Sequence, residues 1–192
     1  MELSKRQQQI VEAAIRIIAD NGIQSLTTKR LATEIGVTEP ALYRHFENKH
    51  EILQTIISYF KITMMPVLQK LRASKPDAEC IFTFVKEHFQ LLESKPYLAK
   101  VIFAEPIFQN DTILKNSILA MMTDSQTVLH ETIQTAARDG KLRLDISAVN
   151  MTRLIAGSMR LLVTQWSMSG MMFNLNSEGS HLANDIYKMI RL

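Results

Sequence analysis

The chain has 192 residues, which is long enough for one or two domains with a buried core. Apolar residues make up 46% and charged residues 21%, the balance of a folded globular protein rather than of a disordered chain. The net charge of +3 leans basic but is too small to indicate nucleic-acid binding by itself. The N-terminus lacks a signal segment, no apolar run is long enough to cross a membrane, and the single cysteine, Cys80, excludes an intrachain disulfide. We therefore expect a cytoplasmic protein.

Apolar residues recur at helical spacing almost throughout, and the alternation typical of strands is absent, so we predict an all-α fold of about nine helices. Residues 1–50 are expected to form a three-helix helix-turn-helix domain, and a long fourth helix leads into a bundle over 51–192. Pro66 lies inside that fourth helix, where its missing amide proton predicts a kink or a break. The expected helices cover about 4–20, 28–34, 38–46, 48–71, 81–92, 97–104, 111–138, 147–169 and 178–190.

Residues 28–46 read as two short helices joined by a tight turn at Gly36. Leu42 and Phe46 are the only large apolar residues of the second helix, so the polar side chains between them point away from the core. An outward face of this kind suits a helix lying in the major groove of DNA. The alternative is an ordinary solvated helix face, because two short helices with a glycine turn occur in many folds.

The side chains on this outward face have the chemistry needed to contact DNA. Arg44 can donate two hydrogen bonds to guanine, and Pro40 and Ala41 offer contact to a thymine methyl group. Glu39 can accept from cytosine N4, or it only favours the helix N-terminus electrostatically. The predicted contacts to bases and phosphates are Thr28, Lys29, Thr38, Glu39, Pro40, Ala41, Tyr43, Arg44, His45 and Lys49.

This segment also resembles the DNA-binding domain of the TetR family of bacterial transcriptional repressors, over about residues 8–53. The resemblance implies that the third helix contacts bases and phosphates and that the lysine opening the fourth helix contacts a phosphate. Glu39-Pro40 departs from the small Ser/Gly pattern common there, which leaves the operator sequence open. The matching residues are Thr28, Leu31-Ala32, Ile35-Gly36-Val37-Thr38, Leu42-Tyr43, His45-Phe46, Lys49 and Ile52-Leu53.

Resemblance to this family further implies a homodimer, since one recognition helix offers too little surface for tight specific binding. The apolar faces of the last two helices are expected to form the dimer interface, although the same faces could belong to the core. The family commonly has a ligand cavity in its bundle, and plain core packing of the same side chains is the alternative. The predicted interface residues are Met151, Ile155, Met159, Leu162, Leu182, Ile186 and Met189, and the predicted cavity residues are Phe60, Met64, Phe82, Phe89, Phe103, Met121, Met122 and Trp166.

Three polar residues of the bundle stand out from their apolar neighbours. His88 shares a face with apolar residues and is expected to be a hydrogen-bonded core or boundary histidine rather than a ligand contact. Arg153 and Arg160 share a helix face that we expect at the solvent or at the dimer rim. A sharper alternative is that they anchor a carboxylated effector.

Motifs for catalysis are absent: the sequence has no phosphate-binding glycine loop, no nucleophile motif and no metal-ligand spacing. We therefore predict that the protein is not an enzyme and needs no cofactor or metal. The predicted function is a transcriptional repressor that binds a near-palindromic operator on double-stranded DNA as a homodimer. A small apolar or amphipathic effector would shift the fourth helix and release the operator. The alternative is a DNA-binding module whose bundle docks a protein partner.

Overall fold

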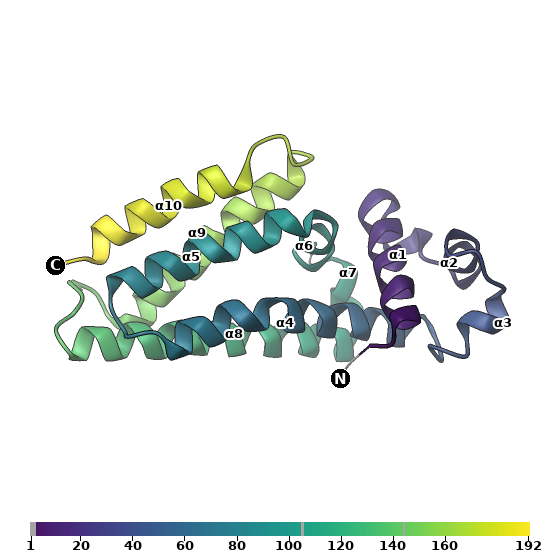
Figure 1. Cartoon of the computed structure of the whole chain (residues 1–192), viewed down its shortest axis with the longest axis horizontal. Coiled ribbons are helices and arrows are strands. Elements are labelled where there is room, and N and C mark those ends of the chain that lie inside the picture. Colours follow the sequence, from purple (N-terminus) through teal and green to yellow (C-terminus); the bar gives the residue numbers. More distant parts are fainter. Residues whose placement is uncertain (1–2, 105, 144) are drawn as a thin grey trace.

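A computed structural model describes residues 3–104, 106–143 and 145–192, and all regular structure in these ranges is helical. An N-terminal head lies at one end of the elongated molecule, and a helical bundle makes up the rest (Figure 1). The head consists of α1 (Lys5–Asn21), the short 3-10 helix η1 (Ile23–Ser25), α2 (Thr28–Glu34) and α3 (Glu39–Leu42). The bundle consists of α4 (Lys49–Ala73), α5 (Ala78–Ser94), α6 (Pro96–Ile102), α7 (Pro106–Gln109), α8 (Thr112–Arg138), α9 (Ala148–Met168) and α10 (Leu175–Ile190).

Side-chain caps explain where several of the helices begin. The Ser4 hydroxyl accepts from the Gln7 amide at 3.2 Å, and the Gln7 side chain accepts from the Ser4 amide at 3.1 Å, a reciprocal capping box. Asn48 accepts from the Glu51 amide at 2.9 Å and begins α4. Asp111 accepts from two backbone amides and begins α8. These helix starts are therefore encoded by residues next to them in the sequence.

Two predicted helices have different ends in the structure. The helix expected over 38–46 ends at Leu42, after which the His45 amide donates back to the Leu42 carbonyl. This tighter turn brings Phe46 into the core of the head, where it is 3% exposed. At Pro66, where the sequence predicts a kink or a break, there is no break, because α4 continues as one helix from Lys49 to Ala73. Buried side chains on both sides of the proline hold the helix in the core.

α5 and α10 pack closely against each other where Gly179 meets Phe89. A Cβ atom placed on Gly179 would lie 2.3 Å from the ring of Phe89, which is itself fully buried. Only a residue without a side chain fits at this crossing. Gly179 therefore fixes how deeply α10 packs against α5.

The head is connected to the bundle in three ways. α4 begins beneath the head and extends along the bundle, and α1 packs against α6. An ion pair joins His50 Nε2, at the start of α4, to the Asp111 carboxylate before α8 at 3.0 Å. A displacement within the bundle can therefore reach the head through packed elements. None of the helices in the described ranges is long and apolar enough to cross a membrane.

Candidate DNA interface and effector cavity

The unit formed by α2, its turn and α3 buries its apolar side and leaves its polar side accessible. Leu31 and Leu42 are almost completely buried, while Tyr43 is 50% exposed. Gly36 has a φ of +68°, a left-handed conformation that glycine adopts without penalty, and it reverses the chain between the two helices. Of the ten predicted DNA contacts, Lys29, Thr38, Pro40, Tyr43 and Arg44 are exposed, and Thr28, Glu39, Ala41, His45 and Lys49 are partly buried.

A hydrogen bond between two of the predicted contacts ties α2 to α3. The Thr28 hydroxyl donates to the Glu39 carboxylate at 2.7 Å. The carboxylate therefore accepts from the protein itself, an arrangement that the sequence analysis did not foresee for either residue. Its effect is to fix the position of α3 relative to α2, which orients the exposed side chains that follow.

Lys49 lies in the first turn of α4, beside the head. Its ammonium donates to the Ile23 carbonyl at 3.1 Å, and burial lowers the pKa of the amine from its usual value. An ammonium group has three N–H donors, so one such bond leaves donors for a phosphate oxygen. The contact with Ile23 holds the side chain against the head instead of letting it extend freely.

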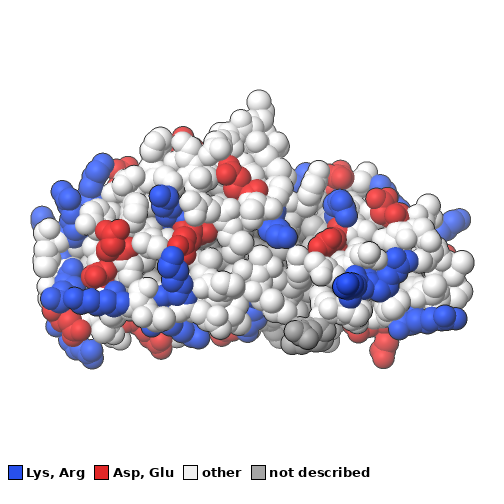
Figure 2. Space-filling model, in the orientation of Figure 1, with Lys and Arg blue, Asp and Glu red and all other residues white. Residues whose placement is uncertain are grey.

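Basic and acidic side chains are interspersed over the face of the molecule seen in Figure 2, and no large field of one sign covers the head. This distribution agrees with the small net charge of +3. Contact with a charged polymer would therefore depend on where individual cations such as Arg44 lie, rather than on a broad basic surface.

An apolar cavity of about 130 Å³ lies inside the bundle, which we call the inner cavity. Five of the eight predicted cavity residues line it: Phe60, Met64, Phe103, Met121 and Met122. Arg160, which the sequence analysis offered only as an alternative effector anchor, also lines it, and the lining residues that were missed are Leu68, Phe84, His88, Ile102, Ile118, Ser125, Gln126, Leu129, Ala156 and Met159. Several of them lie three or four residues from predicted ones, which is the spacing of one helix face.

The remaining three predicted cavity residues lie elsewhere in the bundle. Phe82 packs edge-on against Tyr187, with ring centroids 5.8 Å apart. Phe89 is fully buried at the crossing with Gly179. Trp166 donates its indole N–H to the Phe173 carbonyl at 3.0 Å. These rings belong to the packing around α10 and not to the inner cavity.

His88 corrects one prediction. It lines the inner cavity, and its buried Nδ1 has no hydrogen-bond partner among the described residues, so the expected hydrogen-bonded core histidine is not found. Burial lowers the pKa of His88 to about 4. The imidazole is therefore neutral near pH 7, with one nitrogen available as a donor and the other as an acceptor.

The two arginines of α9 have different surroundings. The guanidinium of Arg160 lies 5.6 Å from the ring centroid of Phe103, and its Nη1 approaches the Met122 sulfur at 3.8 Å. Arg160 lines both the inner cavity and a shallow depression of about 570 Å³ next to it. Arg153 is exposed and donates to Asn150 at 3.1 Å. The shallow depression beside the inner cavity is called the outer hollow below. It is lined by Phe103, Ala104, Gly157, Arg160, Leu161, Thr164, Ser167 and Met168.

The seven predicted dimer residues differ in how deeply they are buried. Leu162 and Leu182 are partly buried and Met189 is 48% exposed. The exposed apolar side chains of α9 are instead Val149 at 45%, Leu154 and Leu161 at 55% and 58%, and Met168 at 83%. The other four predicted residues, Met151, Ile155, Met159 and Ile186, are buried by the chain's own core, which removes them from any surface that a second chain could contact in this conformation.

Two known protein families match segments of this chain. The family described as "Bacterial regulatory proteins, tetR family" matches residues 10–56, and "YsiA-like protein, C-terminal region" matches residues 60–191. The fatty acid metabolism regulator protein of Bacillus subtilis (strain 168) is 24% identical over 186 residues, which cover 95% of this chain and 92% of the relative. The nucleoid occlusion factor SlmA of Shewanella amazonensis is 24% identical over 142 residues, which cover 73% of this chain and 72% of the relative.

Solved structures share the fold. The crystal structure of the transcriptional regulator FadR from Bacillus subtilis in complex with stearoyl-CoA superimposes with a TM-score of 0.78. The two sequences are 24% identical, and the alignment covers 96% of this chain and 99% of the other. The likeness therefore extends over the head and the bundle together.

Proposed function

Because this chain belongs to the TetR family of bacterial regulatory proteins, we propose that it is a transcriptional repressor released from its operator by a small amphipathic effector. It is a DNA-binding regulator and not an enzyme. The observation that carries the proposal is the orientation of α3. Its apolar Leu42 faces the core, while Tyr43 and Arg44 remain exposed at the end of the molecule, where a major groove can receive them.

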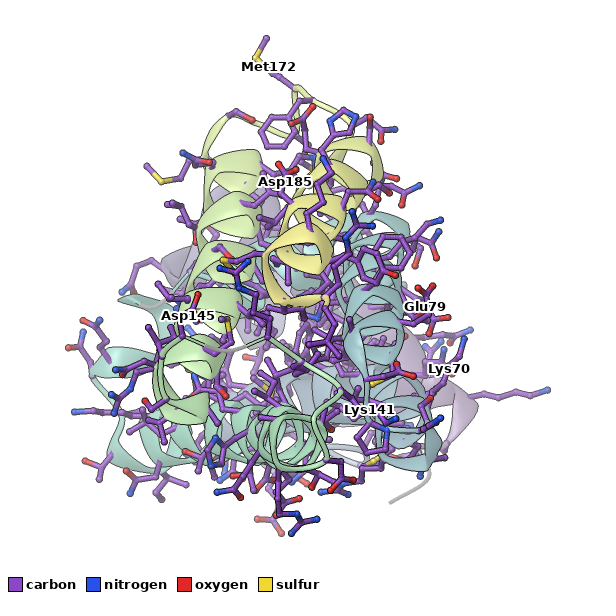
Figure 3. All side chains as sticks on the ribbon, turned by 90° about the vertical axis from the view of Figure 1, so that its left-hand side faces the viewer. Lys70, Glu79, Lys141, Asp145, Met172 and Asp185 are labelled. Atoms are coloured by element: carbon purple, nitrogen blue, oxygen red, sulfur yellow. The ribbon has the colours of Figure 1, made fainter. Side chains whose placement is uncertain are left out.

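The repressor acts as a homodimer on a near-palindromic operator in this proposal. Exposed apolar residues on α9 recur at intervals of three, four and seven, at Leu154, Gly157, Leu161 and Met168. This spacing gives a continuous stripe along one helix face, which we call the α9 face. Figure 3 shows α9 and α10 side by side at the edge of the bundle, with Asp185 on α10. Pairing of two α9 faces would bury this stripe and place two heads on one duplex.

The effector we propose is an acyl thioester or a related amphipathic anion. The inner cavity offers an apolar site for the tail, and Arg160 lies at its border with the outer hollow. The FadR protein of Bacillus subtilis, which has the same fold, is solved with stearoyl-CoA. An apolar cavity with a cation at its border suits a ligand that combines an apolar chain with an acidic group.

Binding in the inner cavity can be transmitted to the head through the elements that line it. Phe60 and Met64 come from α4, and Ile102 comes from α6, which packs against α1. A ligand that favours one arrangement of α4 and α6 would change the spacing of the two heads. Ligand binding shifts the protein only if the two arrangements differ in affinity for the ligand.

Selection of bound fragments from random duplex DNA tests the DNA-binding part of the proposal. We expect two inverted half-sites whose centres lie about 34–36 Å apart, or a multiple of that distance. Arg44→Ala should cost about 1–3 kcal/mol of binding free energy and relax the preference at one base pair. Lys49→Ala should weaken binding to all sequences alike and reduce the salt slope by about 1.

The matched control for these variants is Arg72→Ala, at the exposed far end of α4, which should leave operator affinity unchanged. Recovery of no enriched sequence would contradict the proposal. Equal losses for Arg44→Ala and Arg72→Ala would instead show that Arg44 does not read a base.

A bundle that docks a protein partner is the second candidate function. Met168 at the end of α9 and Met172 in the connection to α10 are exposed, the latter at 87%, and Met172 projects from the molecule in Figure 3. One relative is named a nucleoid occlusion factor. Under this candidate, Met172→Ser should reduce the regulatory effect in cells while operator affinity and effector binding measured on purified protein stay unchanged.

A further inference from the structure

The inner cavity is small and only partly enclosed, and buried side chains form its inner wall. Its volume is about 130 Å³. Phe84, Ile102 and Leu129 form part of its wall and are 6%, 5% and 1% exposed, so they belong to the continuous core of the bundle. Enlarging the cavity in these directions would displace buried side chains that are already in contact with others.

The volume limits the length of an apolar chain that can enter. A cavity of roughly 150 Å³ holds one benzene molecule, which has six carbon atoms. By the same proportion the inner cavity holds roughly five or six carbons, while an 18-carbon chain would need roughly 450 Å³. The stearoyl group named for the related FadR structure is therefore too long for this cavity as it stands.

Arg160 lies where a chain leaving the inner cavity would emerge. It lines both the inner cavity and the outer hollow, as does Phe103, whose ring lies against its guanidinium. The outer hollow, at about 570 Å³, has room for a much larger group and presents the hydroxyl-bearing residues Thr164 and Ser167. An acidic group placed there could accept hydrogen bonds from Arg160.

The outer hollow also overlaps the α9 face. Gly157, Leu161 and Met168 belong to both. When two α9 faces pair, the second copy would form the outer wall of the hollow. A group bound there would then contact both subunits, which places it where it can affect their relative position.

We propose that the effector has a short acyl tail of about six carbons or fewer, held in the inner cavity, and an acidic head bound by Arg160 in the outer hollow. This inference rests on the proposed function and narrows its ligand class. The volume inside the buried wall limits the length of the tail. The positive charge of Arg160 at the border favours an acidic head. The neutral His88 in the wall carries no charge that an apolar tail would have to strip of water.

Calorimetric titration with coenzyme A thioesters of increasing length tests the limit on the tail. The probes are acetyl-, butyryl-, hexanoyl-, octanoyl-, dodecanoyl- and stearoyl-CoA, with coenzyme A alone as the reference. We expect the tightest binding at butyryl or hexanoyl and a loss of at least about tenfold at dodecanoyl. Tighter binding of dodecanoyl- or stearoyl-CoA than of hexanoyl-CoA would overturn the limit.

Enlarging the cavity gives an independent test. Met121→Ala removes three heavy atoms from the wall and should move the preferred tail about two carbons longer. Met172→Ala, at an exposed methionine outside the cavity, is the matched control and should leave the preference unchanged. A misfolded variant would lose all binding without shifting the preferred length. An unchanged preference in a folded Met121→Ala protein would therefore count against the assignment of the tail.

Replacing each of the two arginines of α9 with glutamine, one at a time, tests whether Arg160 binds the acidic head. Arg160→Gln should weaken hexanoyl-CoA binding at least about tenfold. Arg153→Gln, a matched change seven residues earlier on an exposed site, should have no effect. Equal affinities of the two variants would overturn the role of Arg160.

Free hexanoate distinguishes two sources of the negative charge. If hexanoate binds as tightly as hexanoyl-CoA and is weakened by Arg160→Gln, Arg160 binds a carboxylate. If only the thioester binds and Arg160→Gln weakens it, Arg160 acts on the coenzyme A part of the ligand and not on a free carboxylate. Failure of every acyl compound to bind would refute the proposed effector class. DNA selection would still test operator binding separately.

Discussion

Replacing Gly179 with alanine should destabilise the bundle, although alanine is the better helix former. Two effects oppose each other at this position. Alanine in a helix interior gains about 1 kcal/mol over glycine. Its Cβ, however, would lie 2.3 Å from the Phe89 ring and 2.6 Å from the Phe89 Cβ, far inside van der Waals contact. Overpacking of this kind costs about 1–3 kcal/mol or more.

The size of the overlap decides which effect dominates. Phe89 is fully buried, and the overlap includes its Cβ and Cγ, which move little on side-chain rotation, so we take the upper end of the overpacking range. The net result should be about 2 kcal/mol of destabilisation. In a chain of this length that lowers the melting temperature by about 4–8 °C. Thermal unfolding followed by circular dichroism measures the change.

A double-mutant cycle isolates the contact. Phe89→Ala alone should destabilise the protein because it leaves a cavity. Combined with Gly179→Ala it should cost less than the sum of the two single changes, since alanine removes two of the three Phe89 atoms nearest the new methyl group. Strict additivity, or a Gly179→Ala protein as stable as the original, would refute the claim that this crossing has no space for a side chain.

Further predictions concern His88, α2 and α4. Because burial lowers the pKa of His88 to about 4, the unfolded chain binds more protons than the folded one between about pH 6.5 and 4. Stability should therefore fall as the pH falls through this range, and His88→Leu should flatten that dependence in urea unfolding curves. Thr28→Val removes the bond to Glu39 and should weaken operator binding about threefold to tenfold in fluorescence anisotropy, while unchanged affinity would show that α3 needs no such support. Pro66→Ala restores a backbone donor within α4 and should reduce the effect of the effector on operator affinity; an unchanged effect would rule out a hinge there.

Local signals in the sequence were sufficient to predict most helix ends. Asn48 and Asp111 cap the helices that follow them, and Gly36 turns the chain between α2 and α3. The exposed side of α3 could also be predicted, because Leu42 and Phe46 leave only one way to bury apolar surface. Each of these features depends on residues close together in the chain.

The inner cavity and the dimer surface depend on which of two apolar helix faces meets the core. α5 presents both Phe84 and Phe89, and the sequence does not reveal that only the first lines the cavity. On α9, Met159 and Leu161 are both apolar, yet one is buried and the other exposed. Periodicity identifies an apolar face, but the choice between two of them is made by packing against other helices.

The α7 segment and the position of His88 were also missed for lack of local signals. Residues 106–109 form only one helical turn, which is too short to produce a periodic pattern. A histidine among apolar residues has the same sequence pattern whether or not its ring nitrogens find a partner. Only the arrangement of α4, α5 and α8 around the cavity shows that Nδ1 lacks one among the described residues.

Affinity for the selected operator, measured with and without a saturating effector, tests the central claim most directly. Fluorescence anisotropy of a labelled duplex, titrated with protein in the presence and absence of hexanoyl-CoA at fixed salt, gives both dissociation constants. We predict that hexanoyl-CoA weakens operator binding by about 5- to 150-fold, the usual range of coupling between two sites. Hexanoyl-CoA that binds the protein yet leaves the operator dissociation constant unchanged would contradict the account.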